Sequence, residues 1–148
     1  MDILTLFLIV PVITILVLFF AKNLQQARVI ALIGMFVQFL MSFHLVYAYF
    51  QERKTNQDLM VFQRDFVWFE QFNIHYIIGV DGISVAMIVL SSIVVLAGVF
   101  ISWKMEELPK EFFISLIVLA TGVFGFFISL DLFTMFVFYE IAVIPMYL

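Results

Sequence analysis

A single glutamate in the last part of the chain has the residue type and setting that could move a proton. Glu140 stands in the stretch 131–148, DLFTMFVFYEIAVIPMYL, which is otherwise almost wholly apolar after Asp131. Glu140 lies nine positions after Asp131, or about 13 Å of helix rise. The hydrocarbon core of a bilayer is about 30 Å thick, so Glu140 is expected near its midplane. Ionisable groups at that depth usually face protein or a watery cavity and take part in ion or proton movement.

Two further residues of this stretch could support such a role. Burial favours the neutral carboxylic acid, and a nearby cation favours the carboxylate, so the proton affinity of Glu140 should depend on its neighbours. Pro145 has no N–H to donate to the carbonyl of Ile141, which leaves a polar spot beside Glu140 where water could bind. Tyr147 falls near the same helix face as Glu140. The alternative is a glutamate paired structurally with another helix.

His44 is a weaker candidate for a proton relay. It lies in the apolar stretch 29–50, toward its far end. A histidine titrates near neutral pH and can pass on a proton. The plainer interpretation is a side chain that is hydrogen-bonded within the bundle or near the interface. His75 has no set of neighbouring ligands in the sequence that would indicate a metal site.

The composition indicates a polytopic membrane protein. Of the 148 residues, 66% are hydrophobic and 12% are charged, about half the charge of an ordinary soluble domain. There is no cysteine, which excludes disulfides, thiolate metal sites and thiol nucleophiles. The net charge of −4 and the absence of a basic run argue against nucleic acid as a partner.

The elements that must position Glu140 are membrane helices. The sequence predicts an all-α polytopic protein with four complete transmembrane helices and a fifth that is cut short. Between the second and third, the polar segment 51–81 is rich in aromatic and β-branched residues, which predicts a short β-hairpin on the membrane face. The tight Asp131 junction predicts an antiparallel pair for the last two helices. The apolar stretches are 3–21, 29–50, 82–103, 112–130 and the stretch that begins at 131.

Orientation follows from the basic residues, of which the two short turns hold most. The turns are therefore expected in the cytoplasm, with the N-terminus and the loop 51–81 outside. The stretch after Asp131 stops without a basic flank, so we expect the intact protein to continue. The four basic residues of the turns are Lys22, Arg28, Lys104 and Lys110.

Two motifs together resemble a known family. The segments FNIHYIIGVDGIS (72–84) and DLFTMFVFYEIAVIPMYL (131–148) are similar to the antiporter-like membrane subunits of respiratory complex I, of the chain M (mitochondrial subunit 4) type. The resemblance implies that 1–111 supplies three peripheral helices with the external loop 51–81. It implies that 112–148 begins the first antiporter-like repeat, with helices four and five. Glu140 matches the family's fifth-helix glutamate of the proton pathway, although Tyr139 stands where the family often has Trp.

The resemblance implies a proton-translocating subunit of a respiratory NADH-quinone oxidoreductase. It would act within an enzyme while performing no redox chemistry itself. NADH, FMN, iron–sulfur clusters and quinone are expected in partner subunits, and no cofactor or metal is expected in this chain. The other membrane-arm subunits and the lipid bilayer are the expected partners. The bacterial inner membrane is the expected location, ahead of the mitochondrial one. The alternatives are a subunit of a multisubunit sodium/proton antiporter and a non-catalytic membrane scaffold.

Overall fold

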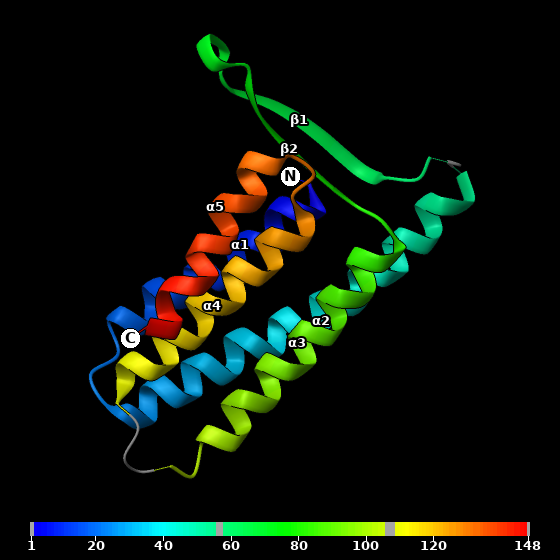
Figure 1. Ribbon diagram of the computed structural model, residues 1–148. Coiled ribbons are helices and arrows are strands. Elements are labelled where there is room, and N and C mark those ends of the chain that lie inside the picture. Colours follow the sequence, from blue (N-terminus) through cyan, green and yellow to red (C-terminus); the bar gives the residue numbers. More distant parts are fainter. Residues whose placement is uncertain (1, 56–57, 106–108, 148) are drawn as a thin grey trace.

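The computed structural model describes residues 2–55, 58–105 and 109–147, and it is mostly helical (Figure 1). A two-stranded antiparallel hairpin is inserted between the second and third helices. Both features confirm the predicted class, a helical protein with a hairpin in the polar segment. The helices are α1 (Ile3–Phe19), α2 (Leu24–Thr55), α3 (Gly82–Ser102), α4 (Lys110–Ile128) and α5 (Leu132–Val143); the strands are β1 (Val61–Phe69) and β2 (Ile74–Val80).

Three of the helices, α2, α3 and α4, are long and apolar enough to cross a membrane. The first helix has 17 residues and the last has 12, so the predicted count of four complete spans is not confirmed. The second helix, with 32 residues, is longer than its apolar stretch 29–50, because no proline or glycine interrupts the polar residues on either side.

The central position in the bundle belongs to α4. It packs against α1, α3 and α5, and less extensively against α2, and Figure 1 shows α5 on the outer side of α4. The side chain of Phe124 on α4 is fully buried and meets Phe7 of α1 edge to face, with ring centroids 5.2 Å apart. Because α4 packs on both sides, it positions α5, and with it Glu140, against the rest of the chain.

The contact between α1 and α2 resolves a defect that Pro11 creates. Pro11 lies inside α1 and cannot donate to the carbonyl of Phe7, one turn back. The buried side chain of Gln38 on α2 donates its Nε2–H to that carbonyl over 3.0 Å. The two helices approach closely nearby, since a Cβ on Gly34 would run into the side chain of Thr14. The helix thus continues through Pro11 with its free carbonyl satisfied by a neighbour.

The hairpin lies over the end of the bundle where α4 ends and α5 begins (Figure 1). Its tip is a single 3-10 turn, Glu70–Phe72, followed by Asn73 in the left-handed conformation, with φ of 52°. Asparagine tolerates that conformation better than most residues. The backbone N–H of Leu130 donates to the carbonyl of Ile77 over 2.9 Å, and Ile78 pairs with Ser129. The hairpin is therefore fixed to the α4–α5 corner by backbone hydrogen bonds.

Candidate functional site

The helix that carries Glu140 begins at a well-formed cap. The Oδ2 atom of Asp131 accepts the backbone N–H of Phe133 at 3.0 Å and that of Thr134 at 3.2 Å. A carboxylate at this position accepts hydrogen bonds from N–H groups that lack a partner within the helix. Its negative charge is also stabilised by the positive end of the helix dipole. Together with the hairpin contact at Leu130, this cap defines where α5 starts and how it leaves the corner.

Two glycines on α4 let α5 approach closely. A Cβ on Gly122 would lie 2.6 Å from the backbone N of Ala142, and a Cβ on Gly125 would run into the ring of Phe138. Small residues at an interface are the usual way in which membrane helices pack tightly. Phe138 and Ala142, with the buried Thr134, recur every four residues and define the face of α5 that α4 covers.

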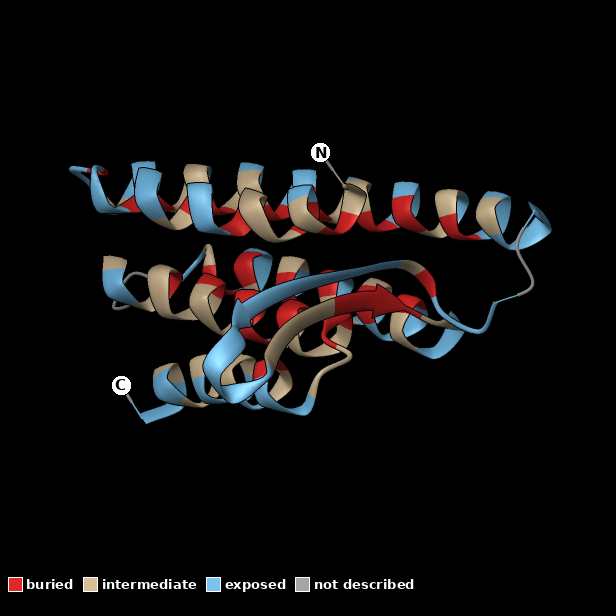
Figure 2. Ribbon diagram, turned by 90° about the horizontal axis from the view of Figure 1, so that it is seen from above, coloured by how far each residue is buried: buried red, intermediate tan, exposed pale blue. Residues whose placement is uncertain are grey.

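Glu140 lies on the opposite face of α5, and its side chain is exposed. The described residues therefore do not bury Glu140, contrary to the expectation from the sequence. The reason is geometric, because α5 is the outermost helix of the bundle in Figure 2 and α4 covers one of its sides. Phe136 and Tyr139, on neighbouring turns, are exposed as well. Glu140 makes no ion pair in the part of the chain that the structure describes.

Pro145 and Tyr147, which were expected to support Glu140, lie just beyond the end of α5. The regular helix stops at Val143, and Ile144–Tyr147 forms a 3-10 turn around Pro145. The N–H of Ile144 still donates to the carbonyl of Glu140. Tyr147 is the most exposed large side chain of this region, at 87%. Pro145 thus ends the helix within one turn of Glu140, and Tyr147 lies at the surface beyond it.

His44 is not brought to Glu140. Its side chain is exposed on α2, and α2 lies across α4 from α5 (Figure 1). One turn further along α2, the Nε2 atom of Gln51 donates to the hydroxyl of Tyr47 over 2.8 Å. The structure therefore offers no direct path of described side chains between His44 and Glu140.

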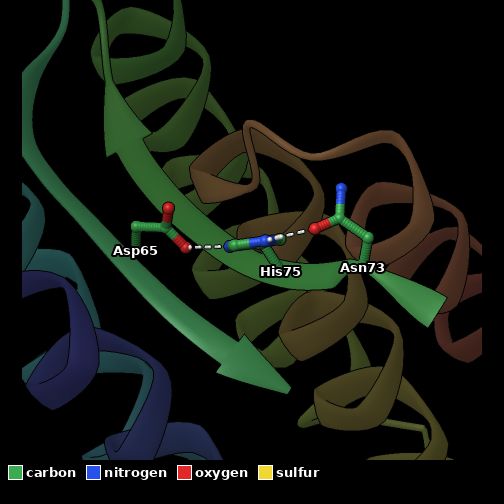
Figure 3. A network of polar contacts seen from close by, with 3 residues as sticks. All are labelled: Asp65, Asn73 and His75. Atoms are coloured by element: carbon green, nitrogen blue, oxygen red, sulfur yellow. Dashed lines mark hydrogen bonds and ion pairs between the residues drawn. The ribbon is translucent and has the colours of Figure 1, made fainter. Parts of the chain in front are cut away.

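The hairpin holds a small polar network near its tip (Figure 3). Nδ1 of His75 lies 2.8 Å from Oδ1 of Asp65 across the two strands, and its Nε2 lies 3.3 Å from Oδ1 of Asn73. This network connects β1 with β2 and with the turn. Among the described residues, no group of three or more His, Asp or Glu side chains could hold a metal ion.

Buried polar contacts between helices are the features that the sequence did not reveal. Besides Gln38, which donates to Phe7, the hydroxyls of Ser42 on α2 and Ser92 on α3 lie 3.0 Å apart in the core. The signal for the first pair was present, since Pro11 frees a carbonyl and Gln38 is polar in an apolar stretch. What the sequence lacked was the register that brings residues 7 and 38 together.

The architecture defines a membrane-type helical bundle with a hairpin across one end. No family model matches the chain. Among curated proteins, it is 33% identical over 97% of its length to NADH-quinone oxidoreductase subunit M of Buchnera aphidicola, and 33% identical over 84% to that of Rhodobacter capsulatus. It is 28% identical over 97% of its length to F(420)H(2) dehydrogenase subunit M of Methanosarcina mazei. It covers 30%, 23% and 28% of these proteins, respectively.

A solved structure shares the fold. A chain from the membrane-bound sulfane sulfur reductase, an archaeal respiratory membrane complex, matches with a TM-score of 0.75 and 17% identity, covering 99% of this chain and 30% of that one. Over most of its length, the chain is thus a homologue of the subunit M and chain 4 proteins of NADH-quinone oxidoreductases. It spans less than a third of the length of the curated relatives described above.

Proposed function

We propose that the chain is part of a proton-translocating membrane subunit of a respiratory NADH-quinone oxidoreductase, in which Glu140 binds and releases the proton. The single observation that carries the proposal is the setting of Glu140. It is a carboxyl group in an apolar helix, on the face that α4 leaves free. In lipid such a group costs about 3 kcal/mol or more. Because of that cost, we expect the face of α5 that carries Glu140 to be covered by protein or to line a water-filled cavity in the intact complex.

The group that covers Glu140 is proposed to include a cation. None of the apolar stretches contains a Lys or Arg, so that cation would come from a segment outside these 148 residues. A lysine or arginine within about 4–6 Å favours the carboxylate, and its withdrawal favours the neutral acid. Movement of the cation would then load and unload the proton. In this proposal, 1–111 forms the peripheral helices and 112–148 begins the first antiporter-like repeat, with residue 148 outside the described part.

Redox chemistry is assigned to other subunits of the same complex. The matched proteins are named for different reactions: NADH-quinone oxidoreductase, F(420)H(2) dehydrogenase and sulfane sulfur reductase. Similar membrane subunits therefore occur in complexes that carry out different redox reactions. This supports a role for the subunit in a step that these complexes share and that is not redox chemistry. NADH, FMN, iron–sulfur clusters and quinone therefore belong to the proposed partner subunits. The proposed location is the bacterial inner membrane, with the N-terminus and the hairpin outside.

The experiment replaces Glu140 with Gln in the complete complex. Glu140→Gln keeps the size of the side chain and removes its titration. We expect normal assembly and a large loss of protons pumped per electron, measured in proteoliposomes with a pH-sensitive dye. Glu70→Gln, in the hairpin turn, makes the same chemical change outside the helices and should leave pumping unchanged. Unchanged pumping in Glu140→Gln would reject the role and favour a scaffold.

The ion itself is tested in the same preparation. A sodium/proton antiporter subunit would show activity that depends on sodium, while a proton carrier would pump in nominally sodium-free medium. Co-purification with iron–sulfur subunits would separate the redox complex from a free-standing antiporter. We expect sodium-independent pumping and co-purification.

A further inference from the structure

An open groove lies at the opposite end of the bundle from the hairpin, between the end of α1 and the start of α2. Its volume is about 480 Å³, within the range of small-molecule sites. The walls are mainly aliphatic and aromatic, and two glutamine amides stand on the α2 side. The lining residues are Val17, Phe20, Ala21, Gln25, Gln26, Val29 and Ile30.

Two cations flank the rim of this groove at Ala21. Lys22 follows Ala21 directly and its backbone N–H donates to Oε1 of Gln26 over 3.1 Å, which leaves the amide Nε2 of Gln26 as a donor. From the start of α4, the Nζ atom of Lys110 donates to the carbonyls of Phe19 at 3.0 Å and Ala21 at 2.9 Å. An ammonium group has three N–H donors, so one remains on Lys110. Lys22 is exposed and forms no ion pair in the described part of the chain.

The charged residues around this groove differ from those around the groove at the other end of the bundle. Among the described residues, no acidic side chain lines the groove between α1 and α2. The groove at the hairpin end, in contrast, is lined by Asp2, Glu52 and Asp58, and Arg64 is the one basic residue among its described lining. The apolar stretch of α1 ends at Ala21, so the basic rim stands where an apolar helix surface gives way to polar residues. That combination of apolar walls with cationic and amide donors at the helix end matches the two parts of a phospholipid.

We propose that this groove binds an anionic glycerophospholipid. The acyl chain lies along the wall formed by Val17, Val29 and Ile30, and the phosphate lies at the rim, near Lys22 and the amide of Gln26. Lys110 adds positive charge next to Ala21. Basic residues close to a membrane attract anionic lipids, and the apolar walls accommodate the first part of an acyl chain. The proposal is independent of the role of Glu140.

Photo-crosslinking tests the site in the full-length protein within its membrane complex. The complex is placed in nanodiscs of phosphatidylcholine that contain a small fraction of photoreactive phosphatidylglycerol or, separately, photoreactive phosphatidylcholine. Labelling is mapped by peptide mass spectrometry. We expect the anionic probe to label the segment 17–30 in preference to the zwitterionic one. Lys22→Gln should lower that labelling about fivefold, the loss expected for one cation near an anionic lipid.

The control is Lys104→Gln, which removes the same charge from the same end of the bundle, at a residue that neither lines the groove nor adjoins a residue that does. It should leave labelling of 17–30 unchanged. Equal labelling by both probes, or an equal loss in both variants, would overturn the proposal in favour of a general surface charge effect. Absence of any label on 17–30 would also overturn it, because protein would then cover the groove. Loss of label on adding inorganic phosphate would replace the lipid with free phosphate as the ligand.

Discussion

The Nε2–H of Gln38 on α2 donates over 3.0 Å to the carbonyl of Phe7 on α1, which is the carbonyl that Pro11 leaves without a helical donor. A helix interrupted by proline normally has an unsatisfied carbonyl that needs water or a neighbouring side chain. Here the neighbour is buried and comes from the next helix along the chain. The hydrogen bond therefore connects a local defect in α1 to the packing of α1 against α2.

Replacement of Gln38 by Leu should destabilise the bundle. The change leaves the Phe7 carbonyl buried without a donor, and interhelical hydrogen bonds of this kind contribute about 0.6 kcal/mol on average and up to about 1.7. We expect a loss of that order in the free energy of unfolding, measured by denaturant titration in detergent micelles. In a Pro11→Ala background, the introduced alanine has an N–H that can donate to Phe7, so Gln38→Leu should cost less. Equal losses in the two backgrounds would show that the hydrogen bond contributes nothing.

Replacement of Gly122 by Ala should displace α5. The new Cβ would lie 2.6 Å from the backbone N of Ala142, and backbone cannot move aside as a flexible side chain can. Overpacking of this kind costs about 1–3 kcal/mol, measured as a lower midpoint of thermal unfolding. Because α5 carries Glu140, the proposed role of that residue also predicts a loss of proton pumping in this variant. The matched control is Gly98→Ala on α3, where the nearest atom, on Leu116, is 3.8 Å away; that change should be neutral or slightly stabilising.

The cap of α3 should make stability depend on pH in the acid range. The side chain of Asp81 accepts the backbone N–H of Ser84 at 2.8 Å. Hydrogen bonds from the side chain and the backbone of Ser84 lower the pKa of Asp81 from its ordinary value of 3.8. The stabilisation is therefore complete above pH 3.8 and is lost as the pH falls through the lower pKa of the folded state.

Two variants test that prediction. Asp81→Ala should cost about 1 kcal/mol at neutral pH, as for other helix caps. Asp81→Asn retains an acceptor without a titrating group, so its stability should vary less between pH 5 and pH 2 (roughly the range in which such a cap titrates). The measurement is unfolding followed by circular dichroism as a function of pH. A parallel pH profile in Asp81→Asn and the unaltered protein would contradict the assignment.

The ion pair between Arg64 and Asp2 should contribute little. The two side chains are 3.0 Å apart, and they are 58% and 34% exposed. Exposed pairs of this type contribute about 0–1 kcal/mol and are screened by salt. Asp2→Asn should therefore change the unfolding free energy by no more than about 0.5 kcal/mol, and by less as salt is added. A larger loss would mean that this contact holds the hairpin on the bundle.

The fold was predictable to the extent that local pattern determines it. The apolar stretches predict all five helices, and the alternation of aromatic and β-branched residues before Gly79 predicts the hairpin. Small residues in an apolar helix indicate a helix contact, and the structure places Gly122 and Gly125 of α4 at one. The ends of α2 were wrong by about five residues on each side, because polar residues without a helix breaker can extend a helix.

Contacts between helices were less predictable, for a physical reason. On α3, both Ser91 and Ser92 are small polar residues, but it is Ser92 that is buried and meets Ser42. One residue turns a helix by about 100°, so a small error in rotation changes the buried face. Glu140 was expected to be buried and is exposed, because the pattern within α5 does not reveal which of its faces a neighbouring helix covers.

The length of α2 has a consequence for how the protein lies in a bilayer. Its 32 residues correspond to about 48 Å of helix, whereas the hydrocarbon core is about 30 Å thick. Even a strongly inclined helix of this length projects beyond the hydrocarbon core. If the start of α2, near Lys22, lies at one headgroup layer, the last turns of α2, with Arg53 and Lys54, extend into the water on the other side. The first strand of the hairpin would then descend toward the membrane from above instead of emerging from it.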